Sequence, residues 1–245
     1  MNLRFFSFAI LASALAVVGT GCENAPGKPK SDPENVRPDQ VTDFATLYGE
    51  NCAACHGDHG KNGAAISLAS PVYLAIAGPA NLQRVTAAGV PGTMMPGFSK
   101  AAGGMLTDQQ IAILVQGMIK TWGNSTELSG LTPPAYASST PGDSANGQKA
   151  FASYCARCHG ADATGNSDKV HTGSLIDPAY LALVSDQGLR SIILAGQPEQ
   201  GMPDWRAETA SSPTRTINDQ EITDIVAWLA SHRVTAPGQP YQQHP

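Results

Sequence analysis

Two segments of the chain repeat apolar residues at the three- and four-residue spacing of an amphipathic helix. The positions are Ile111, Leu114, Val115 and Met118 in the first segment, and Ile222, Ile225, Val226 and Leu229 in the second. A capping box precedes each segment, Thr107 with Gln110 and Asn218 with Glu221. We therefore predict that a helix begins directly after Thr107 and another after Asn218.

Apolar and aromatic side chains are also spaced helically in two earlier stretches. Phe44, Leu47 and Tyr48 mark the first stretch, and Phe151 with Tyr154 marks the second. Loops rich in Gly and Pro separate these segments, and no run alternates apolar with polar residues as a half-buried strand does. The pattern predicts an all-α fold.

The predicted helices belong to a sequence repeat. Three blocks recur: Cys52–His56 at 155–159, Ser67–Ala75 at 174–182, and Asp108–Ile111 at 219–222. The offset grows from 103 to 107 and then to 111, and the middle offset also relates Met95-Pro96 to Met202-Pro203. The chain is therefore a tandem duplication with two short insertions in its second copy.

The repeat and the composition between its copies suggest domain boundaries. Residues 124–142 are rich in Pro, Ser and Thr, and 22–40 contain several prolines with mixed charge, as linkers do. The predicted order is a signal peptide (1–21), a disordered tether (22–40), the first copy (41–123), a linker (124–142), the second copy (143–235) and a tail (236–245).

The N-terminus has the pattern of an export signal. Arg4 precedes an apolar run, Phe5–Val18, that is shorter than the ~20 residues of a membrane-spanning helix. Small residues follow, ending in Gly21 and Cys22, and resemble the lipidation site of a bacterial lipoprotein. We expect a periplasmic protein attached to a membrane through lipid on Cys22; an ordinary cleavage site nearby is the alternative.

The charge balance narrows the range of partners. Fifteen Lys and Arg face 20 Asp and Glu, for a formal net charge of −5. Nucleic-acid-binding domains carry basic patches, so a nucleic-acid partner is not expected. The balance suits a redox protein that docks on partners of complementary charge.

The cysteines carry the most specific signal. Of five, four lie in two C-x-x-C-H strings, Cys52-Ala-Ala-Cys55-His56 and Cys155-Ala-Arg-Cys158-His159. This string is the attachment signature of c-type haem: two thiols three positions apart each bond one vinyl group, and the histidine faces the iron. A redox dithiol or a zinc site shared between the strings is the weaker alternative.

From Val41 to Arg233 the chain resembles a bacterial dihaem cytochrome built from two class I cytochrome c domains. The resemblance implies a helical fold around each of two covalently bound haems, with His/Met ligation of both irons. The implied metal ligands are His56 with Met95, and His159 with Met202, each methionine lying in a Met-Pro step. Competing side chains are Met94 and, more weakly, His171; we expect Met105 and Met118 in the core.

The resemblance carries two packing expectations. Family domains pair a Gly on the helix before the haem string with an aromatic on the last helix. The second copy keeps this pair as Gly147 and Trp228, whereas the first copy holds Phe44 and Gly117 at these places. We predict that each pair is in contact, with large and small partners exchanged. The family also bonds the histidine Nδ1 to a loop carbonyl, here Ile66 or Ser67 and Gly173 or Ser174 by position.

The implied function is single-electron transfer without catalysis. The expected partners are redox proteins such as a quinol-oxidising complex, a terminal oxidase or a periplasmic dehydrogenase. One alternative is a haem enzyme, such as a dihaem peroxidase or a thiosulfate dehydrogenase. Another is a gas sensor, which needs one five-coordinate haem. The sequence contains no quinone, flavin, copper or iron–sulfur motif that would supply further chemistry.

Overall fold

The computed structural model describes residues 36–166, 172–207 and 215–234. The chain divides into two units, 1–40 and 41–245. In the first unit the described residues end in a short 3-10 helix, η1 (Pro38–Gln40). Cys22, the export signal and most of the predicted tether lie outside the described residues.

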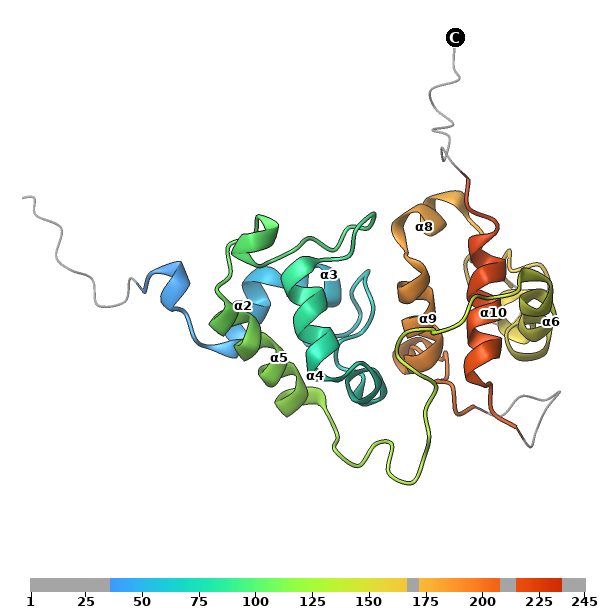
Figure 1. Cartoon of the computed structure of the whole chain (residues 1–245), viewed down its shortest axis with the longest axis horizontal. Helices are drawn as coiled ribbons and strands as arrows, with labels where there is room; N and C mark the ends of the chain where they lie inside the picture. The colour runs from blue at the N-terminus through green and yellow to red at the C-terminus, as the bar shows by residue number, and fades with distance from the viewer. Residues whose placement is uncertain (1–35, 167–171, 208–214, 235–245) are drawn as a thin grey trace, which may run out of the picture. The chain divides into compact units, whose positions relative to one another are not determined.

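The second unit contains both copies of the repeat, coloured from blue to green and from yellow to red in Figure 1. The helices of the first copy are α2 (Phe44–Asn51), α3 (Ala53–His56), α4 (Pro71–Ala88), η2 (Lys100–Ala102) and α5 (Asp108–Trp122). Those of the second copy are α6 (Ser144–Tyr154), α7 (Ala156–His159), α8 (Pro178–Leu183), α9 (Asp186–Ala195), η3 (Pro198–Gln200) and α10 (Asp219–Ala230). Apart from isolated bridges, the described ranges hold no β structure, so the predicted all-α fold is confirmed.

The helix break in the middle of each copy falls at the same repeat position. Gly78 interrupts α4 with φ 67° and ψ 164°, just before Pro79. The residue 107 positions later, Ser185, caps α9 after the gap that follows α8. Pro79 explains the first break, because it has no N–H for the helix ladder, and the Ser185 side chain starts a new helix in the second copy.

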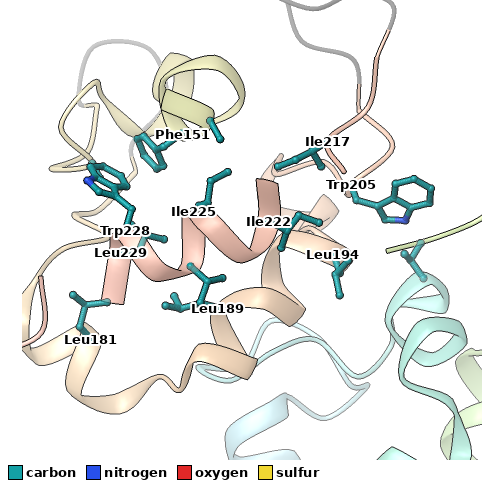
Figure 2. Packing of buried hydrophobic residues seen from close by; sticks show 14 residues of the cluster. Phe151, Leu181, Leu189, Leu194, Trp205, Ile217, Ile222, Ile225, Trp228 and Leu229 are labelled. Carbon is teal, nitrogen blue, oxygen red and sulfur yellow. The ribbon is translucent and has the colours of Figure 1, made fainter. Parts of the chain in front are cut away.

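Both final helices begin where the sequence predicts. Thr107 and Gln110 form a reciprocal capping box at the start of α5, and Asn218 and Glu221 do the same for α10. The predicted apolar faces of both helices are buried. Figure 2 shows α10 in the core of the second copy, where Ile222 and Ile225 are fully buried and Phe151 of α6 lies on the side of Ile225.

The exchanged helix-crossing pairs are confirmed in both copies. A Cβ placed on Gly117 would lie 2.1 Å from Phe44 Cδ2, so the ring of α2 rests directly on the glycine of α5. A Cβ on Gly147 would lie 2.8 Å from Trp228 Cβ, and the Trp228 ring stacks near Phe151, centroid to centroid 4.6 Å. Close packing conserves the volume at the crossing while the two helices exchange its large and small members.

The linker is held against the second copy. Arg190 of α9 is buried, with 3% exposure, and donates from Nη2 to the carbonyl of Ala135 at 2.7 Å and to the carboxylate of Asp219. Gln187 Nε2 donates to the Tyr136 carbonyl at 2.8 Å. A buried guanidinium must be hydrogen-bonded, so these carbonyls make the linker part of the second copy's packing.

Candidate haem sites

Each C-x-x-C-H string forms one helical turn directly after an aromatic helix. The Cys52 N–H donates to the Tyr48 carbonyl at 2.8 Å, and the His56 N–H donates to the Cys52 carbonyl at 3.0 Å. The second copy repeats both bonds with the Cys155 and His159 amides. This turn gathers two thiols and one imidazole on a short rigid segment, which is the arrangement that covalent attachment of a haem requires.

Before a haem is attached, burial disfavours the thiolate form of the first cysteine in each string. Burial, with a smaller contribution from Cys55, raises the pKa of Cys52 to about 11. Burial and then Cys158 raise the pKa of Cys155 to about 12. All four thiols of the strings are free of disulfides, which suits addition to vinyl groups. Within the described ranges, no group of three or more His, Cys, Asp or Glu is arranged to hold a metal ion, so the zinc alternative gains no support.

His56 is oriented by a backbone carbonyl. Its Nδ1 lies 2.8 Å from the Ile66 carbonyl oxygen, which settles the choice between Ile66 and Ser67. Burial lowers the pKa of His56, and the neutral ring donates from Nδ1, which leaves Nε2 free to bind a metal. Tyr48 supports the same turn, because its hydroxyl donates to the Gly57 carbonyl at 2.9 Å. The sequence analysis placed Tyr48 on the helix before the haem string but did not predict this bond.

Within the described ranges, the second copy leaves three buried polar atoms without a protein partner: the Tyr154 hydroxyl, His159 Nδ1 and Trp205 Nε1. Burial lowers the pKa of His159, but its Nδ1 makes no hydrogen bond, so the predicted bond to Gly173 or Ser174 is absent from the described ranges. Trp205 Nε1 is also buried without a partner, three residues after Met202. Buried donors are normally satisfied, so the unpaired Trp205 Nε1 indicates a site completed by another group, and a haem propionate would be a suitable acceptor for it.

The two Met-Pro loops have the same backbone pattern. The Val90 N–H donates to the Met95 carbonyl at 3.0 Å, and the Gln197 N–H donates to the Met202 carbonyl at 2.8 Å. In each case the donor follows the glycine that ends a helix, Gly89 after α4 and Gly196 after α9. The shared register makes Met95, rather than Met94, the equivalent of Met202.

Gly89 and Gly196 lie in direct backbone contact with the methionine loops, where no side chain would fit. A Cβ on Gly89 would lie 2.5 Å from Gly97 N and 2.7 Å from Met95 O. A Cβ on Gly196 would lie 2.5 Å from the carbonyl carbon of Pro203. Both residues also have positive φ, 72° and 65°, which glycine adopts without strain. These positions therefore fix where each methionine loop crosses the end of its helix.

The methionines differ in burial. Met95 and Met202 are half-buried, whereas the competing Met94 is 76% exposed. Met118 lies in the core as predicted, but Met105 is 79% exposed, so its predicted core position is wrong. Met105 precedes buried Leu106 at the end of a Gly-Gly turn, where the chain is too close to the surface to bury both residues.

The structure therefore gathers each Cys pair with its histidine, and places each methionine on a separate loop of the same copy. Iron ligation by Met95 and Met202 stays a prediction. His171 lies outside the described residues. Sequence reasoning also missed Glu127 and Arg206, which are 79 positions apart and form an ion pair that no local motif announces.

Two family models match the chain. Residues 144–233 match the cytochrome c family, and residues 39–116 match subunit III of the cbb3-type cytochrome c oxidase. The comparison with curated proteins found no match. Among solved structures, a chain of a reducing HAO-like protein complex from Kuenenia stuttgartiensis aligns with 15% identity over 79% of this chain and 99% of its own, with a TM-score of 0.47.

Proposed function

Because the chain is a dihaem c-type cytochrome built from two tandem cytochrome c domains, we propose that it carries single electrons between redox protein partners and converts no substrate of its own. The two covalently bound c-type haems supply one-electron chemistry at iron. One observation carries the proposal: each copy contains a buried or half-buried C-x-x-C-H histidine and a half-buried methionine, and the two methionines occupy the same loop register.

His/Met ligation at both irons leaves no open coordination position for a substrate or a gas. In the proposed arrangement His56 and Met95 occupy the two faces of the first haem, and His159 and Met202 those of the second. Thioether ligation raises the reduction potential and suits transfer at the oxidising end of a chain. The Ile66 carbonyl holds the His56 ring in one orientation and one tautomer, so the protein contributes positioning and burial.

We place the protein in the periplasm, attached to a membrane by lipid on Cys22. The export-like N-terminus supports this location. Among the described residues, no helix is both long and apolar enough to span a bilayer. A Cys22→Ser variant is expected to leave the membrane fraction and appear as soluble protein. Unchanged membrane attachment of that variant would contradict the anchor.

The partners in this proposal are a quinol-oxidising complex, a terminal oxidase or a periplasmic dehydrogenase. The match of the first copy to an oxidase subunit supports an oxidase among them. The copies also differ in charge: the first has four Lys and Arg against four Asp and Glu, and the second has seven against eleven. Different charge at the two ends favours different docking partners for electron entry and exit.

Optical redox titration of the purified dihaem protein tests the ligation. Ferric haem with a methionine ligand has a charge-transfer band, which we expect from both haems and expect to halve in Met95→His and in Met202→His. Met94→Leu is the matched control and should keep the full band. Rapid CO binding to a reduced haem, or peroxidase or thiosulfate-oxidising turnover, would instead indicate a vacant position and an enzyme or sensor.

A further inference from the structure

The methionine loop of the second copy carries an arginine that folds back on it. Arg206 lies four residues after Met202 and donates from Nε to Asp204 Oδ1 at 3.0 Å and from Nη2 to Asp204 Oδ2 at 2.6 Å. The two parallel bonds join guanidinium and carboxylate in the bidentate geometry that Arg favours. These bonds close the part of the loop that follows the Met-Pro step.

The linker supplies the second carboxylate of this network. Arg206 Nη2 donates to Glu127 Oε1 at 2.9 Å, and Nη1 donates to the Glu127 carbonyl at 3.3 Å. The side chains of Glu127, Asp204 and Arg206 are 19%, 18% and 33% exposed. Partial burial and several shared bonds distinguish this network from an isolated surface ion pair, which contributes little.

Glu127 is itself held in place by Asn124, the first residue of the linker. After α5 ends at Trp122, the Glu127 N–H donates to the Asn124 carbonyl at 3.1 Å, closing a turn. Asn124 Nδ2 donates to Glu127 Oε2 at 3.2 Å, so each oxygen of the carboxylate has a partner. The bonds to Asn124 already restrict the Glu127 side chain, so less side-chain conformational entropy is lost when it pairs with Arg206.

We call the network of Glu127, Arg206 and Asp204 the clamp, and the first copy lacks the residues for it. At the repeat offset of 107, Gly97 stands in place of Asp204 and Ser99 in place of Arg206. The Ser99 side chain caps η2 by accepting from the Ala102 N–H at 3.3 Å. Among the ion pairs of the described residues, the one between Arg206 and Glu127 ties the second methionine loop to a segment outside its own copy, and the first methionine loop has no equivalent.

We propose that Glu127 is a positioning residue for Met202: through Arg206 it restrains the loop that holds the thioether against the second iron. The inference rests on the His/Met ligation proposed above. The methionine reaches iron only while its loop stays closed, and the clamp bridges that loop to the end of α5. Loss of the Glu127 charge leaves the Arg206–Asp204 pair and the bond from Arg206 Nη1 to the Glu127 carbonyl in place, but it weakens the tie between the loop and the linker.

Exchange of the methionine for added imidazole measures how often the loop opens. The experiment uses the full-length ferric dihaem protein with Met95→His, so that the remaining methionine band reports the second haem alone. Glu127→Gln is expected to speed imidazole exchange about three- to tenfold, the effect of losing the net contribution of one ordinary hydrogen bond, because glutamine can still accept a bond but carries no charge. Arg206→Lys keeps the positive charge but loses the bidentate guanidinium bonds, so it should also speed imidazole exchange.

Glu199→Gln is the matched control. Glu199 lies three residues before Met202, is exposed, and forms no ion pair within the described ranges, so its substitution removes the same charge without touching the clamp. It should leave the exchange rate within about twofold. The midpoint potential of the second haem should fall in Glu127→Gln relative to Glu199→Gln, because a loosened thioether stabilises ferrous iron less.

The outcomes distinguish the positioning role of Glu127 from the proposed ligation of the second iron by Met202. Equal exchange rates in Glu127→Gln and Glu199→Gln, with the methionine band present, would overturn the positioning role alone. A Met95→His protein without any methionine band would remove Met202 as a ligand and overturn both. Faster exchange confined to Glu127→Gln and Arg206→Lys supports the clamp.

Discussion

Gly147 is the point of closest approach between the first and last helices of the second copy, and its replacement by alanine is a sharp test of the exchanged crossing. A Cβ at Gly147 would lie 1.9 Å from Asp224 O and 2.5 Å from Asp224 C. Both atoms belong to the backbone of α10, so neither can rotate away as a flexible side chain would. The helices themselves must separate.

The cost follows from these distances. Ordinary contact of a Cβ begins at 3.4 Å, so α6 must move from α10 by about 1.5 Å at this point. Overpacking costs roughly 1–3 kcal/mol, and an unyielding backbone neighbour places this site near 3 kcal/mol. Alanine regains about 1 kcal/mol of helix propensity over glycine. Gly147→Ala is therefore expected to lower the stability of the second copy by about 2 kcal/mol.

Native-state hydrogen exchange followed by mass spectrometry measures this loss locally, in peptides covering α6 and α10. Gly49→Ala is the control, because nothing lies within 4 Å of a Cβ there and the residue is exposed in helix α2. The control should stabilise its helix by about 0.5–1 kcal/mol. Protection of α6 and α10 in Gly147→Ala equal to or above that of the wild type would refute the close crossing.

Three further predictions concern the first methionine loop, the N-cap of α2 and the linker. Gly89→Ala is expected to weaken the Met95–iron band, because its Cβ would strike the methionine loop; Gly92 has a similar positive φ, 76°, but open space around its Cβ, so Gly92→Ala should keep the band. Hydrogen bonds from the Thr46 N–H and hydroxyl lower the pKa of Asp43. A carboxyl whose pKa is lowered in the folded state contributes stability at pH values above its unfolded pKa of about 3.9. That contribution is lost as the pH falls through the folded pKa. The difference in urea stability between the wild type and Asp43→Asn should therefore disappear as the pH falls below about 4. Arg190→Met removes the buried donor to the linker, and amide exchange of residues 135–140 should rise about tenfold; unchanged exchange would mean that the linker is held by other contacts.

Local rules determined much of this protein from its sequence. Capping boxes and apolar spacing located α5 and α10, because both features depend on residues only a few positions apart. Alignment of the copies located the exchanged pair of Phe44 and Gly117, although these residues are 73 positions apart, because a duplication exposes a compensated change. The two C-x-x-C-H strings indicated covalent haem, since the chemistry of attachment lies within one helical turn.

Tertiary structure decided the features that depend on segments without a common motif. The sequence admitted Ile66 and Ser67 equally as the partner of His56, and only the path of the loop selected Ile66. Composition indicated a linker at 124–142, but the structure shows that buried Arg190 hydrogen-bonds the linker to the second copy. Glu127 of the linker also pairs with Arg206 of the second methionine loop, 79 positions away. Burial, not sequence separation, sets the energy of such contacts, because a charged group removed from water must find its partners wherever the fold presents them.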